Sequence, residues 1–507
     1  MKNEKESLVP FPASKQLSFI TALLGVLLLQ AVFATVCRAQ SAKITAGVAH
    51  GLASGGLQRM IVVLDQQADL SGAQSLSTKA EKTRYVYETL RAMADRTQPA
   101  VAAAISQAGL IPSARLYIEN ALVATAAPNN VISGPAVYSL AARADVASIQ
   151  TDGPVTVDPL EQHLSAASVP IGIAWNVAWI QAPAVWADGF TGQGIVVGDL
   201  DTGVQWNHPA LINQYRGWNG SSADHNYNWW DPTIEASPVP IDQEGHGTAT
   251  TGIMVGDDGQ GNQIGVAPGA KWIACRGLGP GANVSTVLTC LQFMLAPWDL
   301  TGANPDPTKA PDVVNNSFVC PFCGLQQAFA NLRAAGIVSV AATGNFGPAC
   351  GSVFDPGDYP AVFSIGALSY KQNIVAPFSS RGPNSQPPFT LPAIVAPGTL
   401  ITSAQPTDTY ATGSGTSFAA PAASGAVALV WSARHDLVGD VGATIQLLES
   451  SATPDLSLSC GSSFRPNQLY GYGTLNVAAA LGLQSSPTST QQASALPQTK
   501  ASPRGGQ

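Results

Sequence analysis

The fold of this chain is best inferred from residues 413–421, Gly-Ser-Gly-Thr-Ser-Phe-Ala-Ala-Pro. The two glycines permit a sharp backbone turn, and residues 419–431 have the Ala, Val and Leu content of a helix. Ser417 is therefore expected at the start of a helix, where unpaired backbone N–H groups and the helix dipole favour negative charge. This makes Ser417 a candidate nucleophile; the alternative is an N-cap in a glycine-rich turn.

Length and charge limit what the rest of the chain can be. Its 507 residues exceed a single hydrophobic core, so we expect two folded units with flanking segments. Only 11% of the residues are charged and the net charge is −8, which argues against a nucleic-acid partner and suits a soluble acidic protein.

The first 39 residues have the pattern of a secretory leader. Lys2, Lys5 and Lys15 precede an apolar stretch at residues 17–36, and a cleavage site follows at Ala39. This predicts a secreted protein, extracellular or periplasmic. The apolar stretch also approaches the ~20 residues that span a bilayer, so a retained N-terminal anchor is the alternative.

Six cysteines remain once the leader is set aside. An even number in an exported chain favours disulfides, although the sequence does not choose among the pairings. Two of them form a CxxC, but a zinc or redox site would need a second ligand pair or a thioredoxin-like context, and neither is present. The six are Cys275, Cys290, Cys320, Cys323, Cys350 and Cys460.

Residues 40 to about 165 predict a small α+β domain. Residues 59–65 read as a strand, 79–107 as a helix with a break near Pro99, and 116–126 and 146–150 as further strands. His50 and His163 are isolated, so no catalytic cluster is expected here. A domain of this kind ahead of a catalytic unit is typical of a propeptide; the alternative is an attached binding module.

From residue 169 onward, apolar runs alternate with loops rich in Gly, Pro and Asn, which predicts parallel strands joined by helices. Residues 195–203 form an apolar strand that ends in Asp201-Thr-Gly. Sites in open α/β sheets form at the carboxyl ends of strands, so Asp201 lies where chemistry is expected. The alternative is an Asp that caps a turn.

His246 is the candidate base, because Gly245 and Gly247 leave room around its ring and the following residues predict a helix. A neutral imidazole can take a proton from Ser417 and return it, while Asp201 would fix its tautomer. His208 is the other candidate, but its setting in Trp-Asn-His-Pro is typical of a structural loop histidine.

Together, Asp201-Thr-Gly, Gly245-His-Gly-Thr and Gly415-Thr-Ser resemble the three active-site motifs of the subtilisin family of serine proteases, in the order Asp, His, Ser found in subtilisin. The resemblance covers residues 169–482. Residues 272–276 and 315–317 look more like bacillopeptidase F-type members. The resemblance to the subtilisin family implies a subtilisin-like three-layer α/β fold with a mostly parallel sheet, preceded by a small α+β, ferredoxin-like propeptide domain.

The same resemblance assigns further roles. Asp201, His246 and Ser417 would form the catalytic triad. Asn345, after the apolar residues 337–342, matches the residue that supplies the oxyanion-hole side chain.

Three consecutive residues, Asn315, Asn316 and Ser317, match the wall of the substrate cleft, where an extended peptide adds as a strand. Asp358 matches the far end of the S1 pocket, where a carboxylate would favour Lys or Arg at P1; the alternative is an Asp that caps its own loop.

No cofactor is required for this chemistry. Residues 256–262 occupy the loop where subtilisins often bind calcium, and their composition suits either a structural calcium ion or a solvated turn.

The sequence thus predicts a leader at 1–39, a propeptide domain at 40–165, a catalytic domain at 166–484 and a disordered tail at 485–507. It predicts a monomeric, secreted, self-processing serine endopeptidase whose partners are polypeptide substrates and its own propeptide as an intramolecular inhibitor. An exopeptidase of the same fold and a catalytically silent exported binding protein are the alternatives.

Overall fold

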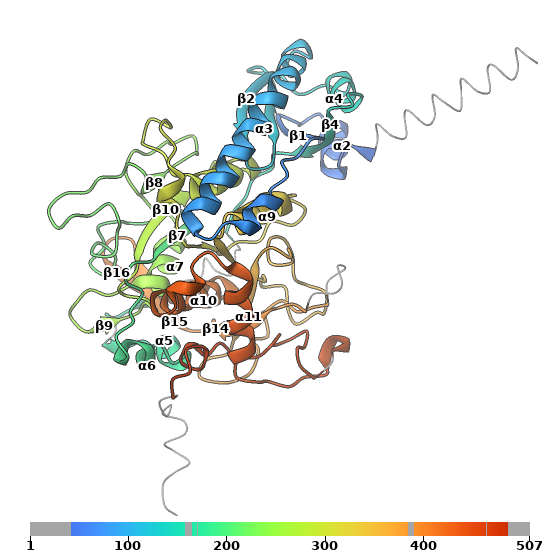
Figure 1. Ribbon diagram of the computed structural model, residues 1–507. Coiled ribbons are helices and arrows are strands. Elements are labelled where there is room, and N and C mark those ends of the chain that lie inside the picture. Colours follow the sequence, from blue (N-terminus) through green and yellow to red (C-terminus); the bar gives the residue numbers. More distant parts are fainter. Residues whose placement is uncertain (1–41, 158–164, 170, 384–389, 463, 485–507) are drawn as a thin grey trace, which may run out of the picture. The chain divides into compact units, whose positions relative to one another are not determined.

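The structure is a computed structural model, and it describes residues 42–157, 165–169, 171–383, 390–462 and 464–484 (Figure 1). The predicted leader, His163, most of the segment in which propeptide cleavage is expected and the predicted tail lie outside the described residues. The chain divides into two compact units. The first holds the described residues up to Asp65 with Pro99–Ser113 and Leu122–Thr151; the second holds Gln66–Gln98, Ala114–Ala121 and the residues from Asp152 on. The predicted domain boundaries stay predictions.

The N-terminal sheet has the strand order β2-β3-β1-β4, and its elements follow each other as βαββαβ, which is the ferredoxin-like arrangement. Alternate residues of β1, including Met60 and Val62, pack into one apolar cluster with Val101 and Ile105 of α3. These elements are β1 (Arg59–Leu64), α3 (Lys79–Gln107), β2 (Ile111–Leu116), β3 (Ala121–Thr125), α4 (Gly134–Ala141) and β4 (Val146–Thr151).

The predicted helix break near Pro99 is wrong, because α3 runs without interruption through this residue. A proline removes one helical hydrogen bond and normally kinks the helix. Here the residues that follow, Val101 and Ile105, are fully buried in the cluster, and this packing holds the last turns in place.

The larger sheet has seven parallel strands in the order β14-β13-β12-β11-β7-β10-β8, which confirms the predicted three-layer α/β fold. Its strands are almost wholly buried, as expected for a parallel sheet with helices on both faces. The strands are β7 (Val196–Asp201), β8 (Trp229–Trp230), β10 (Lys271–Arg276), β11 (Val313–Asn316), β12 (Val338–Ala342), β13 (Phe363–Leu368) and β14 (Ile394–Pro397).

Helices α7 (His246–Val255) and α10 (Thr416–Ala433) pack on each other and on the sheet, as do α8 (Val284–Leu295) and α9 (Gln326–Ala334). Further elements are α2 (Ala46–Ala53), β5 (Ser165–Ala167), β6 (Gly172–Ile173), α5 (Trp175–Trp179), α6 (Ala182–Ala187), β9 (Asn262–Gln263), β15 (Ile401–Gln405), β16 (Thr409–Gly413), α11 (Val441–Ser451) and α12 (Val477–Ala480).

Helix α10 is the centre of this unit, and its small residues explain how it fits there. A Cβ on Gly425 would come within 2.6 Å of Val266 and 3.0 Å of the Met254 carbonyl, so the glycine permits the close approach of α10 to its neighbours. Within the described part of the chain, α10 alone has the length and apolar composition of a membrane-spanning helix, and 94% of it is buried in the fold.

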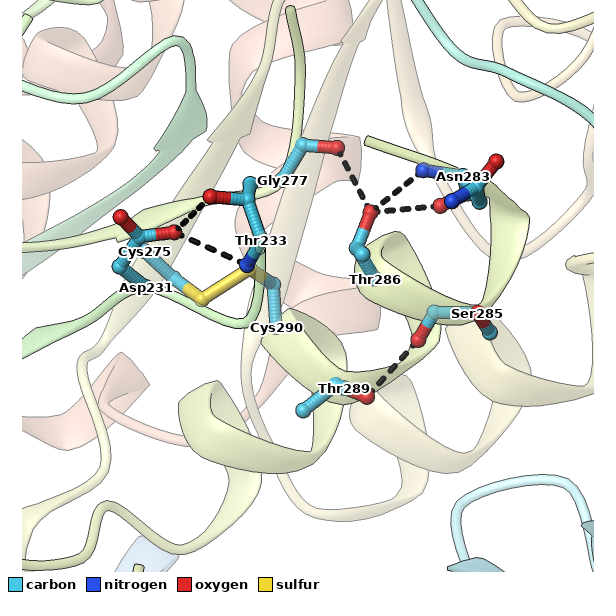
Figure 2. Close-up of a disulfide and its surroundings, with 9 residues drawn as sticks. All are labelled: Asp231, Thr233, Cys275, Gly277, Asn283, Ser285, Thr286, Thr289 and Cys290. Carbon is cyan, nitrogen blue, oxygen red and sulfur yellow. Dashed lines mark hydrogen bonds between the residues drawn. A yellow bond between two sulfur atoms is a disulfide. The ribbon is translucent and has the colours of Figure 1, made fainter. Parts of the chain in front are cut away.

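The prediction that the cysteines form disulfides is confirmed, with pairs Cys275–Cys290, Cys320–Cys323 and Cys350–Cys460. Figure 2 shows the first pair, which joins strand β10 to helix α8 with a Cα–Cα distance of 5.5 Å.

Candidate active site

Asp201 and His246 meet at the carboxyl edge of the sheet. Asp201 is the last residue of β7 and His246 is the first residue of α7, and both are almost fully buried. His246 Nδ1 lies 2.7 Å from Asp201 Oδ1. An ionised carboxylate only accepts hydrogen bonds, so the proton belongs on Nδ1 and the lone pair on Nε2. Burial raises the pKa of Asp201, while the His246 ring and the Thr202 N–H favour its carboxylate.

The start of α7 is held by Asp242, which sequence reasoning missed. Asp242 Oδ1 accepts from the N–H groups of Glu244 at 3.1 Å and Gly245 at 2.8 Å and from the Thr202 hydroxyl at 2.9 Å. Its Oδ2 accepts from the N–H and hydroxyl of Thr248 at 2.9 and 2.6 Å. Asp242 therefore satisfies the N–H groups that a helix start leaves without partners and ties them to the residue after Asp201.

Ser417 is the second residue of α10, as the opening motif predicts, and is buried. Its Oγ donates to the Ser317 carbonyl at 3.0 Å, and its own carbonyl accepts from Ser317 Oγ at 2.9 Å. Pro421 explains the second bond, because it lacks the N–H that would bond the Ser417 carbonyl within the helix. The ring of Phe418 lies 6.1 Å from that of His246, so the first turns of α7 and α10 meet.

Asn345 follows strand β12 and contacts the residue before the candidate nucleophile. Its Oδ1 accepts from the N–H of Thr416 at 2.9 Å and from the Thr416 hydroxyl at 3.1 Å. Because the Thr416 N–H and hydroxyl hold the amide oxygen of Asn345, its Nδ2 donor points away from them. Gly344, with φ of 99°, provides the turn that brings Asn345 off the strand.

The sequence matches a known protein family. The model of the subtilase family, Peptidase S8, matches residues 192–473, more than half of the chain. The chain belongs to the subtilase family. This is a family of serine endopeptidases that need no cofactor for catalysis.

Three relatives show how far the likeness of this subtilase extends. Bacillopeptidase F of Bacillus subtilis (strain 168) is 35% identical over 445 residues, which are 82% of this chain and 30% of that relative. Alkaline protease of Alkalihalobacillus alcalophilus is 29% identical over 66% of this chain and 76% of its own length. Subtilisin Savinase of Lederbergia lenta is 31% identical over 62% of this chain and 99% of its own length. The chain thus spans less than a third of the length of bacillopeptidase F.

The expected cleft-wall residues of this subtilase have fully buried side chains. Asn315 Nδ2 donates to Asp199 Oδ1 and to Ser317 Oγ, each at 3.0 Å, and Asn316 Nδ2 donates to two strand carbonyls. A peptide substrate would therefore contact the backbone of residues 315–317 and not their side chains. The substrate-binding role of Asn315, Asn316 and Ser317 stays a prediction.

The structure places Asp358 on a cavity of about 250 Å³ that Arg333, Thr390 and Glu449 also line. No member of the expected triad lines this cavity, and neither does Asn345. The expected position of Asp358 in the S1 pocket stays a prediction.

The two carboxylates in the expected calcium loop are engaged with the loop itself. Asp257 Oδ1 accepts from the Gly259 N–H and Asp258 Oδ1 from the Gln260 N–H, each at 2.8 Å. In the parts of the chain that the structure describes, no three His, Cys, Asp or Glu side chains gather into a metal-binding group. A structural calcium ion at this loop stays a prediction.

His208 has the structural role expected of it. Its Nδ1 accepts from the Ala210 N–H and its Nε2 lies 3.1 Å from the Thr409 carbonyl, so the ring links its own loop to the start of β16. Burial lowers the pKa of His208, which keeps the ring neutral.

A second buried acid, Asp199, was also missed by sequence reasoning. It lies two residues before Asp201 on β7, and the period of a strand places both side chains on the same face of the sheet. This alternation was the signal available in Asp199-Leu200-Asp201. Burial, together with the charge of Asp201, raises the pKa of Asp199 to about 8.

Proposed function

We propose that this protein is a secreted serine endopeptidase that acts on polypeptides through Ser417, His246 and Asp201. The observation that carries this proposal is the 2.7 Å contact between His246 Nδ1 and Asp201 Oδ1, beside the first turn of α10. This contact fixes the tautomer that a general base needs. The family match and the named proteases among the relatives support the same reaction class.

The proposed reaction has two halves. Ser417 Oγ attacks the peptide carbonyl carbon while His246 Nε2 takes the hydroxyl proton, and Asp201 stabilises the imidazolium that forms. Asn345 Nδ2 and the Ser417 N–H donate to the oxyanion. His246 then gives its proton to the leaving amine, and a water molecule hydrolyses the acyl-enzyme by the same steps in reverse.

We also propose that residues 40–165 are the protein's own propeptide and inhibitor. Residues 153–155 support this, since they pair as an extended segment with residues 279–284. The Val155 N–H donates to the Ala282 carbonyl at 3.2 Å, and the Val284 N–H to the Gly153 carbonyl at 3.0 Å. The Gly277 and Leu278 N–H groups bond the Asp201 carbonyl, so this pairing continues directly from the end of β7.

Two charged residues of the proposed propeptide add to this support. Asp152 accepts from the N–H and hydroxyl of Ser285 at 2.8 and 2.7 Å, and so stabilises the positive end of the α8 dipole. Lys79 Nζ pairs with Asp312 Oδ1 at 2.8 Å in a largely buried position.

A fluorophosphonate probe tests the proposed activity directly. It should label wild-type protein and leave Ser417→Ala unlabelled, and it would label neither form if the protein were a catalytically silent binding protein. Internally quenched peptides with both ends blocked separate the endopeptidase from the exopeptidase alternative, which would leave them intact.

Self-processing is tested with the same variant. We expect Ser417→Ala, made in a host that lacks other secreted proteases, to stay uncut between about residues 158 and 169. A processed Ser417→Ala protein would show that another protease removes the propeptide. Gel filtration of the matured wild type tests the expected monomer, and mass spectrometry of the medium tests secretion and the mature N-terminus.

We propose that Asp358 favours Lys or Arg at P1, as its place in the sequence motif suggests. Matched peptides that differ only at P1 test this: an unchanged Arg-to-Leu ratio of kcat/KM in Asp358→Asn would exclude Asp358 from the S1 pocket.

A further inference from the structure

Asp199 is a buried carboxyl group that the proposed reaction does not use. It has no exposed surface, and removal of a carboxylate from water is unfavourable unless its oxygens are hydrogen-bonded. An apolar side chain of similar size would avoid this penalty. The partners that satisfy Asp199 come from two other elements of the catalytic unit, α7 and β11.

One oxygen of Asp199 contacts the helix that begins with His246. Asp199 Oδ2 accepts from the Thr250 hydroxyl at 2.9 Å and the Thr251 hydroxyl at 2.8 Å. Thr250 lies one helical turn after His246, and its Oγ1 is also 3.5 Å from Asp201 Oδ2, the carboxylate oxygen that does not bond His246. The Thr250 hydroxyl therefore lies between the two acids and fixes α7 against β7.

The other oxygen of Asp199 leads to the candidate nucleophile. Asp199 Oδ1 accepts from Asn315 Nδ2, which donates its second hydrogen to Ser317 Oγ, each at 3.0 Å. Ser317 Oγ in turn donates to the Ser417 carbonyl at 2.9 Å. Ser424, two turns further along α10, donates to Asn315 Oδ1 at 3.4 Å. A continuous series of hydrogen bonds thus runs from Asp199 through β11 to α10.

We infer that Asp199 is a positioning residue of the active site, whose two oxygens hold α7 and α10 in register so that His246 meets both Asp201 and Ser417. This inference rests on the proposed function. Asp199 touches none of the three reacting groups, so it acts through Thr250 and Asn315. A misplacement of about 1 Å lowers turnover by about 100-fold, which is why a residue outside the reaction can matter this much.

The protonation state fits this role. The groups that face Asp199 are Asp201 on its own strand, two hydroxyls of α7 and the Asn315 amide of β11, and none of them is a cation. The raised pKa means that Asp199 is a neutral acid below about pH 8. In the neutral form Oδ2 carries a proton and donates it to one of the two threonine hydroxyls, so that this one bond is reversed. The contacts to both helices remain, and no second negative charge lies beside Asp201.

The test measures kcat for each titrated active site, with fluorophosphonate as the titrant, in four variants. We expect Asp199→Ala to lower this kcat 10- to 100-fold with KM within 2-fold of wild type. Thr250→Val, which keeps the shape of the side chain, should lower it 3- to 10-fold. Asp199→Asn keeps an acceptor oxygen for Asn315 Nδ2 and places an amide N–H against the threonine hydroxyls, which can accept it, so it should return kcat to within 3-fold of wild type. Ser403→Ala, which removes a buried hydroxyl that bonds the Ala249 carbonyl of α7, is the matched control and should stay within 2-fold.

A purely structural role would reduce the number of titrated sites and leave kcat per site unchanged. If Asp199→Ala does not fold, Thr250→Val decides the question alone. Values within 2-fold of wild type for Thr250→Val and for any folded Asp199→Ala would overturn the inference. Failure of the probe to label wild type, with Ser417→Ala as the blank, would instead reject the proposed function.

Discussion

Replacement of Asp242 by Ala should weaken both the fold and the reaction, because this one carboxylate accepts five hydrogen bonds at the start of α7. Two of the donors, the N–H groups of Gly245 and Thr248, belong to buried residues of the helix start. A buried N–H that loses its acceptor costs about 1–3 kcal/mol, which gives about 2–6 kcal/mol for the pair. Asp242 itself is partly exposed, so water can replace some of the lost bonds. We therefore expect a loss of about 2–3 kcal/mol in the free energy of unfolding.

The assay for Asp242→Ala has two parts. Urea unfolding is measured in a Ser417→Ala background, which prevents self-digestion, and kcat per titrated site is measured in the active protein. A shift of His246 by a fraction of an ångström should lower kcat about tenfold. Asp436→Ala, which removes an exposed ion pair with Arg434, is the control and should leave stability close to that of wild type, because water and salt screen an exposed pair. The reasoning is refuted if Asp242→Ala matches this control in stability and keeps kcat within 2-fold.

Three further predictions concern the oxyanion, a titration and a disulfide. Asn345→Ala should lower kcat about 100- to 1000-fold with little change in KM, a magnitude known from the corresponding donor of subtilisin, and steady-state kinetics would contradict this with a loss below 10-fold. Asp199 has a raised pKa in the fold, so the stability that its neutral form provides is complete below about pH 4 and is lost as the pH rises to about 8. Relative to Asp199→Asn, the unfolding free energy of wild type should therefore fall by up to about 1.4 kcal/mol per pH unit across this window. Unfolding free energies of the two proteins that run parallel from pH 5 to 8 in urea would argue against it. Loss of the Cys350–Cys460 disulfide, which joins residues 110 positions apart, should cost about 2–5 kcal/mol in the same unfolding assay, and an unchanged urea midpoint in the double Ser variant would show that the crosslink does not stabilise the fold.

The sequence predicted the fold class because its information is local and repeated. Each parallel strand is a short apolar run, and the strands that approach the site lead into a distinctive polar motif, as with Asp201 at the end of β7 and Asn345 after β12. Some glycines mark positions where a Cβ would clash with a neighbouring residue. Gly245 has φ of 88°, and a Cβ there would overlap with the Gln405 side chain. Such positions are visible in a sequence because the constraint lies in the residue itself.

Long-range packing explains most of what the sequence did not predict. Pro99 indicated a helix break, yet the burial of the residues after it keeps α3 continuous. Asp242 lies three residues before Gly245, and only the turn of the chain brings its carboxylate onto the helix start. The disulfide partners of six cysteines depend on distances that no local pattern reveals.

The place of Asp199 on its strand was visible in the sequence, but its contacts were not. The two effects predicted for it, on kcat and on stability, separate the role of its hydrogen bonds from the role of its charge. Strand alternation places it beside Asp201, but only tertiary contacts reveal that it reaches both α7 and β11. Its hydrogen bonds should make turnover sensitive to Ala and tolerant of Asn, whereas its titration should make Asn more stable than wild type at neutral pH. A neutral amide would keep turnover and raise stability, so stability does not explain why this residue is Asp. If Asn at residue 199 raises stability and still leaves a measurable loss of kcat, the acidic proton of Asp199 itself contributes to the register of the two helices.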